Sequence, residues 1–153
     1  MKIAQILLSI CLLWGFVACQ TTTPQASVTA TVNEEFGLAP GQSAAVKGTN
    51  LILTFDSVLN DERCPSAVEC AASGPVTVSL SIQQGNGTPI DFTLQTFTDQ
   101  NGRSPNVQFE GVTNRAEVGD YLIRVASVIP YPTDLTTEIE PSEYQVALLV
   151  SNK

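Results

Sequence analysis

Alternation of apolar and polar residues recurs from residue 36 onward, in short runs that are separated by turn residues. The clearest run is 76–82, VTVSLSI, in which every second residue is apolar. A glycine-rich turn follows, and 90–97, IDFTLQTF, alternates again, so the pattern predicts a β-hairpin over 76–96. Alternation of this kind is typical of antiparallel sheets that bury one face.

The same pattern predicts further strands, and no segment beyond the first residues carries a helical stripe of apolar positions. Seven or eight short strands in about 120 residues indicate an all-β fold, and we expect an antiparallel, immunoglobulin-like β-sandwich. Phe55, Phe92 and Phe109 are expected to point into its core. The further predicted strands are 44–48, 51–59, 106–112, 120–128 and 143–151.

The first 18 residues have a different pattern. Lys2 is followed by sixteen mostly apolar residues without charge, and Cys19 comes directly after them. This is the layout of a secretion signal, and the run is shorter than the roughly 20 residues of a membrane span. We therefore expect residues 1–18 to be a signal peptide that is removed.

The expected cleavage site, Phe16-Val17-Ala18-Cys19, resembles the lipobox of bacterial lipoproteins. The resemblance implies that Cys19 is acylated and becomes the mature N-terminus, which anchors the protein to a membrane of the cell envelope. Two or three acyl chains anchor a protein firmly where one does not. Gln20 favours the outer membrane or cell surface. The alternative is ordinary cleavage that leaves Cys19 as a free thiol.

The residues after the expected cleavage site are rich in threonine, alanine and serine, and they carry no charge up to residue 33. We expect 19–33 to be the lipidated cysteine and a flexible tether, and 34–153 to be the β-sandwich domain. The alternative is that 27–32, SVTATV, adds an edge strand to the domain.

Four cysteines are present, and the signal peptide changes how they can pair. Cys11 is lost with the signal and Cys19 carries lipid, so Cys64 and Cys70 remain in an oxidising compartment. We expect these two to form a structural disulfide. A redox pair or a metal site are the alternatives, although the spacing is not C-x-x-C and the chain lacks histidine.

Beyond the lipobox, the chain resembles a group of small, uncharacterised bacterial lipoproteins with an R-C-P-x-x-V-x-C loop. The resemblance covers about 115 residues and implies a β-sandwich on a lipid anchor, without a known activity. It rests on Phe36-Gly37-Leu38-Ala39-Pro40-Gly41-Gln42, on Thr54-Phe55-Asp56-Ser57-Val58, on Arg63 through Cys70 with Gly74, and on Pro130-Tyr131-Pro132 before Tyr144-Gln145-Val146.

Charge and composition narrow the possible functions. Seven basic and fifteen acidic residues give a net charge of −8, and removal of Lys2 leaves six against fifteen, or −9. An acidic balance argues against nucleic-acid binding. Absence of histidine removes Ser-His-Asp and Cys-His catalysis, and no glycine-rich phosphate loop is found. We expect no cofactor and no resident metal.

We therefore expect a non-enzymatic binding or structural module of the bacterial envelope, with an unidentified envelope protein as its partner. The alternatives are a small secreted enzyme or redox protein that uses Cys64 and Cys70, and a loop-based inhibitor or accessory subunit. End loops usually carry the function of a sandwich, here 60–74, 98–106 and 130–142. The first of them is expected to present Asp61, Glu62 and Arg63. The acidic stretches 98–104 and 133–143 are open candidates for calcium.

Overall fold

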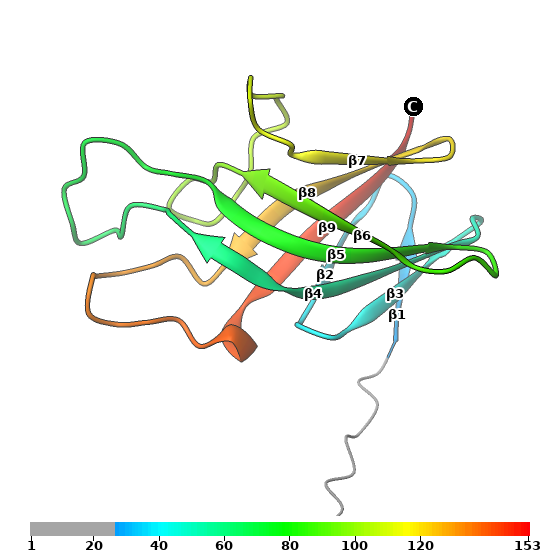
Figure 1. Ribbon diagram of the computed structural model, residues 1–153, viewed down its shortest axis with the longest axis horizontal. Coiled ribbons are helices and arrows are strands. Elements are labelled where there is room, and N and C mark those ends of the chain that lie inside the picture. Colours follow the sequence, from blue (N-terminus) through cyan, green and yellow to red (C-terminus); the bar gives the residue numbers. More distant parts are fainter. Residues whose placement is uncertain (1–26) are drawn as a thin grey trace, which may run out of the picture.

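The computed structural model describes residues 27–153, and within them the chain folds into β-strands and one short 3-10 helix (Figure 1). The predicted all-β class is confirmed. The elements in chain order are β1 (Val28–Thr31), β2 (Glu35–Leu38), β3 (Ser43–Lys47), β4 (Leu51–Asp61), β5 (Val76–Gln84), β6 (Ile90–Thr96), β7 (Arg115–Val118), β8 (Tyr121–Ile129), η1 (Pro141–Glu143) and β9 (Gln145–Asn152).

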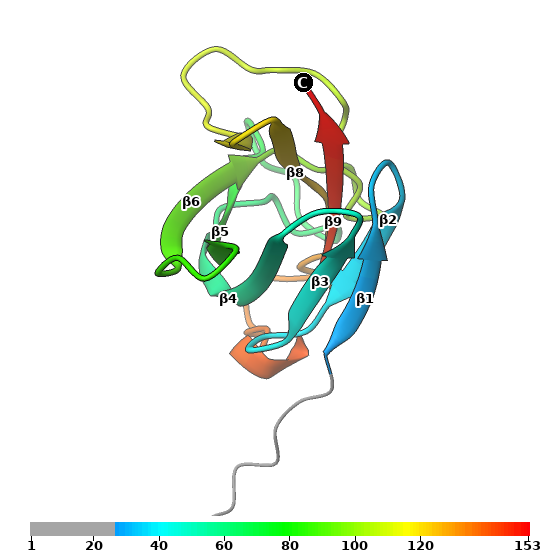
Figure 2. The ribbon, with the colours of Figure 1, turned by 90° about the vertical axis from the view of Figure 1, so that its right-hand side faces the viewer.

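The strands form two sheets that pack face to face (Figure 2). The five-stranded sheet has the order β1-β3-β4-β5-β6, and the four-stranded sheet has the order β2-β9-β8-β7. Neighbours are antiparallel except β1 and β3, which are parallel. Each sheet contains an unbroken meander, whereas an immunoglobulin domain interleaves its strands between sheets as ABED and CFG. The architecture is a β-sandwich, and the immunoglobulin-like strand order is not confirmed.

The core lies between the two sheets and follows the alternation of the sequence. All four apolar residues of VTVSLSI are buried, as are Tyr144 just before β9 and Val146, Leu148 and Val150 within it. Phe55 is fully buried in β4. The β6 pattern is only partly confirmed, because Leu94 is buried, Phe92 is half-buried, and Ile90 at the strand end is 59% exposed.

Two predictions about the limits of the strands are wrong. Val28–Thr31 form an edge strand beside β3, so the tether predicted for 19–33 is wrong after residue 27, and the alternative of an edge strand within 27–32 is confirmed. The predicted strand 106–112 lies in a loop, because Gly111 has a φ of +76° and Val107 is half exposed. Phe109 consequently packs edge-to-face on Phe97 outside the main core, with ring centroids 4.9 Å apart.

The predicted signal peptide and the lipidation residue Cys19 lie outside the described residues. Within residues 27–153, no helix has both the length and the apolar character needed to cross a membrane.

Register shifts interrupt the pairing of two central strands, β4 and β8. The register between β4 and β5 shifts twice, between Phe55 and Ser57 and between Val58 and Asn60. The register between β8 and β9 shifts between Val125 and Ser127. Bulges bend a strand and re-aim the side chains beyond them. Asp61 at the end of β4 and Ile129 at the end of β8 both lie beyond these shifts.

Candidate functional site

Three connections gather at one end of the sandwich, here called the loop end and defined as residues 61–75, 98–106 and 130–144 (Figure 1). Backbone hydrogen bonds join the first and third segments, from Ser66 N to Pro132 O at 3.0 Å and from Ala67 N to Thr133 O at 2.8 Å. The second segment is joined to β8, where Val128 N donates to Gly102 O at 2.9 Å. The loops that the sequence singled out therefore meet.

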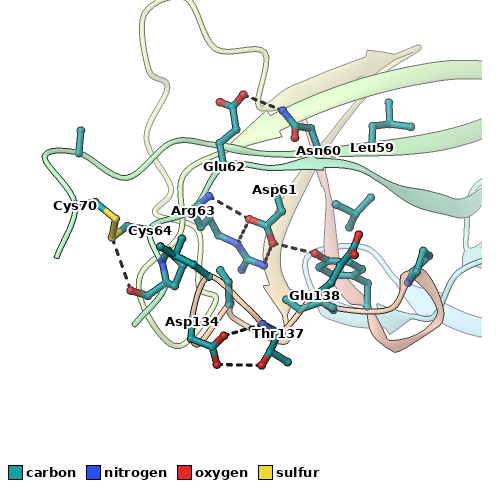
Figure 3. Close-up of a pocket in the computed structure, with 18 residues that line it drawn as sticks. Leu59, Asn60, Asp61, Glu62, Arg63, Cys64, Cys70, Asp134, Thr137 and Glu138 are labelled. Atoms are coloured by element: carbon teal, nitrogen blue, oxygen red, sulfur yellow. Dashed lines mark hydrogen bonds and ion pairs between the residues drawn. A yellow bond between two sulfur atoms is a disulfide. The ribbon is translucent and has the colours of Figure 1, made fainter. Parts of the chain in front are cut away.

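A cleft of about 630 Å³ opens between the first and third segments of the loop end (Figure 3). Two of its apolar side chains are unusually exposed, with Leu135 at 77% and Leu59 at 57%. Glu62 and Glu138 add carboxylates to the lining. The cleft thus combines apolar contact surface with negative charge, and it is open to solvent.

A buried arginine organises the wall of this cleft. Arg63 and Asp61 are two residues apart in extended chain, so their side chains leave the same face. Arg63 donates to Asp61 twice, from Nε to Oδ1 at 2.7 Å and from Nη2 to Oδ2 at 2.5 Å (Figure 3). The Arg63 side chain is fully buried and that of Asp61 is 12% exposed. A bidentate pair of this kind is among the stronger charge-assisted contacts.

The same guanidinium reaches across to the other sheet. Nη1 of Arg63 donates to the carbonyl oxygen of Val128 at 2.8 Å, and Nη2 donates to that of Pro130 at 2.9 Å. The guanidinium also lies over the ring of Tyr131, 4.9 Å from its centroid. Arg63 therefore ties the end of β4 to the end of β8 and closes the sandwich at this end.

Two tyrosines complete the network. The hydroxyl of Tyr144 donates to Oδ2 of Asp61 at 3.1 Å. Burial, followed by the negative charge of Asp61, raises the pKa of Tyr144 to about 12, so this phenol stays protonated and keeps donating. The hydroxyl of Tyr131 donates to the carbonyl oxygen of Cys64 at 2.8 Å. The polar groups around Arg63 are therefore matched in charge and in hydrogen bonding.

The cysteine loop lies at the rim of the cleft. Cys64 and Cys70 are joined by a disulfide, with their Cα atoms 6.0 Å apart. Gly74 closes the loop against β4, where its N–H donates to Glu62 O at 2.9 Å. A Cβ at Gly74 would lie 2.5 Å from the Cβ of Glu62, so this close approach requires glycine. The predicted pairing is present in the structure, and it fixes the first loop in one shape.

We expect Cys64→Ser with Cys70→Ser to lower the free energy of unfolding by about 2 kcal/mol, because the cross-link closes a short loop. Urea unfolding of the purified full chain, followed by circular dichroism, measures this change. In the wild type, titration of the unfolded, unreduced chain is expected to show no reactive thiol from these residues. Two reactive thiols would contradict the structural role.

In each of the two acidic stretches considered for calcium, one aspartate is hydrogen-bonded within its own segment. Oδ1 of Asp99 accepts from the backbone N–H groups of Asn101 and Arg103, at 2.9 and 2.8 Å. The carboxylate of Asp134 accepts from the hydroxyl and backbone N–H groups of Thr136 and Thr137, and these bonds lower its pKa to about 2. In the part of the chain that the structure describes, no three His, Cys, Asp or Glu side chains are grouped so as to hold a metal ion.

The structure corrects the expected display of Asp61, Glu62 and Arg63. Asp61 and Arg63 are engaged with each other and are largely inaccessible, while Glu62 lines the cleft and accepts a hydrogen bond from Asn60 at 2.8 Å. Sequence reasoning missed the exposed Leu135. The spacing Asp-x-Arg at the end of a strand was the available signal for the ion pair, since i and i+2 share a face.

Several of the segments that carry the resemblance to small lipoproteins lie together at the loop end. The Arg63–Cys70 loop and the Pro130-Tyr131-Pro132 turn meet at the buried guanidinium, and Gly74 packs against Glu62 beside it in the chain. Comparison of the chain with family models, with curated proteins and with solved structures finds no match. Its function therefore has to be argued from its own residues.

Proposed function

We propose that the chain is a lipid-anchored protein of the bacterial envelope, whose β-sandwich acts as a non-enzymatic binding or structural module. The observation that carries the proposal is the order of features at the N-terminus. An uncharged apolar run ends at Val17-Ala18-Cys19, and an uncharged polar stretch follows. An extracytoplasmic location is also the setting in which a disulfide such as Cys64–Cys70 persists.

The short distance between the anchor and the domain limits where the module can act. Eight residues, 20–27, separate Cys19 from the start of β1. Fully extended, they would span at most roughly 28 Å. A lipid on Cys19 would hold the sandwich close to the membrane surface, so its partner would also lie near that surface.

The loop end is the part of the domain that we assign to partner binding. Leu59 and Leu135 give the cleft apolar contact surface, and Glu62 and Glu138 give it charge. The scaffold beneath is held by the Arg63 network and the disulfide. Loops fixed on a rigid sandwich are a common way to build a binding surface. Because Asp61 and Arg63 already satisfy each other, they serve support rather than acid–base chemistry.

Metabolic labelling with radioactive palmitate tests the anchor. We expect the wild-type chain to be labelled and Cys19→Ser to be unlabelled, because acylation needs the thiol of Cys19. Cys11→Ser is the matched control, since it removes a thiol from the same apolar run and should label like the wild type. Equal labelling of Cys19→Ser and wild type would overturn the anchor.

Site-specific photo-crosslinking in cells tests the loop end. A photoreactive residue at position 135 is expected to give an adduct of higher mass, because Leu135 lies in the cleft and is 77% exposed. The control position is Ile90, which is 59% exposed and lies at the start of β6. Adducts at both positions, or at neither, would contradict binding through the loop end.

A further inference from the structure

The outer face of the four-stranded sheet brings two arginines together. Arg115 in β7 and Arg124 in β8 are Cα partners in the antiparallel register. Their neighbours Ala116 and Ile123 are buried in the core, so both arginines leave the opposite, outer face. Cβ atoms of such a pair lie about 4.5–5.5 Å apart, and like charges placed directly opposite destabilise a sheet. The pair therefore calls for a compensating negative charge.

Basic residues are scarce elsewhere in the domain. Residues 27–153 contain six Lys and Arg against fifteen Asp and Glu. Four of the six belong to the four-stranded sheet or are attached to it, namely Arg103, Arg115, Arg124 and Lys153. A positive cluster on a strongly acidic domain is not explained by its average composition.

The nearest carboxylates are already engaged by other cations. Arg103 holds Glu35 through two hydrogen bonds, of 2.7 and 2.9 Å. Lys153 pairs with Glu117 at 2.7 Å. The positive charge of Arg124 also helps to lower the pKa of Glu35. Its effect is smaller than that of the hydrogen bonds from Arg103. Arg115 and Arg124 thus lack a carboxylate of their own among the described residues.

Both guanidinium groups also have polar atoms that are hidden from water. Nε of Arg115 and Nη1 of Arg124 are buried, and each lacks a hydrogen-bond partner within residues 27–153. A desolvated charged donor without an acceptor is costly. A negative charge bound over the two guanidinium groups would offset that cost and would relieve the repulsion between them.

An acceptor without a partner lies in the same region. A cavity of about 400 Å³ is lined by Asn114, Arg115, Glu117 and Lys153, and Arg124 is not part of its lining. Asn114 is 6% exposed, and its Nδ2 donates to Val107 O at 2.7 Å. That bond fixes the amide orientation and leaves Oδ1 buried without a donor. This cavity therefore lies beside the arginine pair, and it is not part of the site proposed below.

We propose that Arg115 and Arg124 form a binding site for a phosphate group on the outer face of the four-stranded sheet. A phosphate carries up to two negative charges and several acceptor oxygens, which matches two guanidinium groups. Two sources carry such a group, a free inorganic phosphate and a lipid headgroup. The site is separate from the loop end and does not depend on the proposed anchor.

Nuclear magnetic resonance of the full chain in a nonionic detergent tests this site. Sodium phosphate is titrated at constant ionic strength, and the Nε–Hε signals of the arginines are followed. We expect saturable shifts of Arg115 and Arg124, with those of Arg63 unmoved, because Arg63 is fully occupied. A parallel titration uses glycerophosphoglycerol, a soluble lipid headgroup. Tighter binding of this ligand than of sodium phosphate would identify the lipid headgroup as the source, and the reverse would identify the free anion.

Two variants make the test specific. Arg115→Gln is expected to weaken phosphate binding at least tenfold. Lys47→Gln removes the same charge from β3 of the other sheet and should leave the affinity unchanged. Equal weakening by both variants would reveal a general charge effect and overturn the site. Absence of saturable shifts with both ligands, or shifts spread over all arginines, would overturn it too.

Discussion

Arg63→Ala is expected to lower the free energy of unfolding by about 3–5 kcal/mol, because it breaks a buried ion pair and leaves one partner behind. The Arg63 side chain is fully buried, and its loss would strip Asp61 of its counter-charge. The carbonyl oxygens of Val128 and Pro130 would lose their donors as well. Urea unfolding followed by circular dichroism measures the change.

Arg103→Ala is the matched control for this prediction. Its ion pair with Glu35 is bidentate, but the side chains are 52% and 34% exposed, so we expect a loss of about 1 kcal/mol or less. The double variant Asp61→Asn with Arg63→Met should lose less stability than Arg63→Ala, since no unpaired charge remains. Equal losses for Arg63→Ala and Arg103→Ala would show that Arg63 does not close the sandwich.

Gly102→Ala is expected to lower the free energy of unfolding by about 2–4 kcal/mol, through backbone strain combined with a steric clash. Gly102 has a φ of +75°, a region that favours glycine. A Cβ there would press against the backbone carbonyl oxygen of Val128, which cannot rotate away. The same oxygen accepts the hydrogen bond from Arg63, so the clash reaches the network of the loop end.

Gly41→Ala separates strain from clash, because Gly41 has the same φ of +75° and no heavy atom within 4 Å of a built Cβ. We expect Gly41→Ala to cost about 1 kcal/mol from the backbone conformation alone. Thermal and urea unfolding of both variants give the comparison. An equal loss of stability in Gly102→Ala and Gly41→Ala would contradict the predicted clash between the 98–106 segment and β8.

The sequence predicted those strands whose alternation is long and regular. β5 carries four inward apolar residues at strict spacing, and β9 carries three that continue the spacing from Tyr144, so their faces could be assigned. β2 and β7 are four residues long and bury two or fewer residues each, which is too short for a period to show. β1 was assigned to the tether because its composition is polar, yet Ala30 is buried. The order of strands within the sheets depends on long-range pairing that no local pattern encodes.

The candidate site was predictable only in part for the same reason. Compartment and cysteine count were enough to predict the disulfide. Arg63 was expected at the surface, because arginine is seldom fully buried unless it is paired. Its partners Val128 and Pro130 are 65 and 67 residues away in the chain, so the pocket that receives it exists only after the two sheets meet.

The parallel pairing of β1 and β3 bears on how the domain would resist a mechanical pull from its N-terminus. Tension along β1 would load the hydrogen bonds between residues 28–31 and 44–47 together, in shear, instead of opening them one after another. Behind β1, the turn at Asn33 is fixed to the opposite sheet, where Asn33 N donates to Val150 O at 2.7 Å. A force that entered through residue 28 would therefore be shared by both layers of the sandwich before it reached the core.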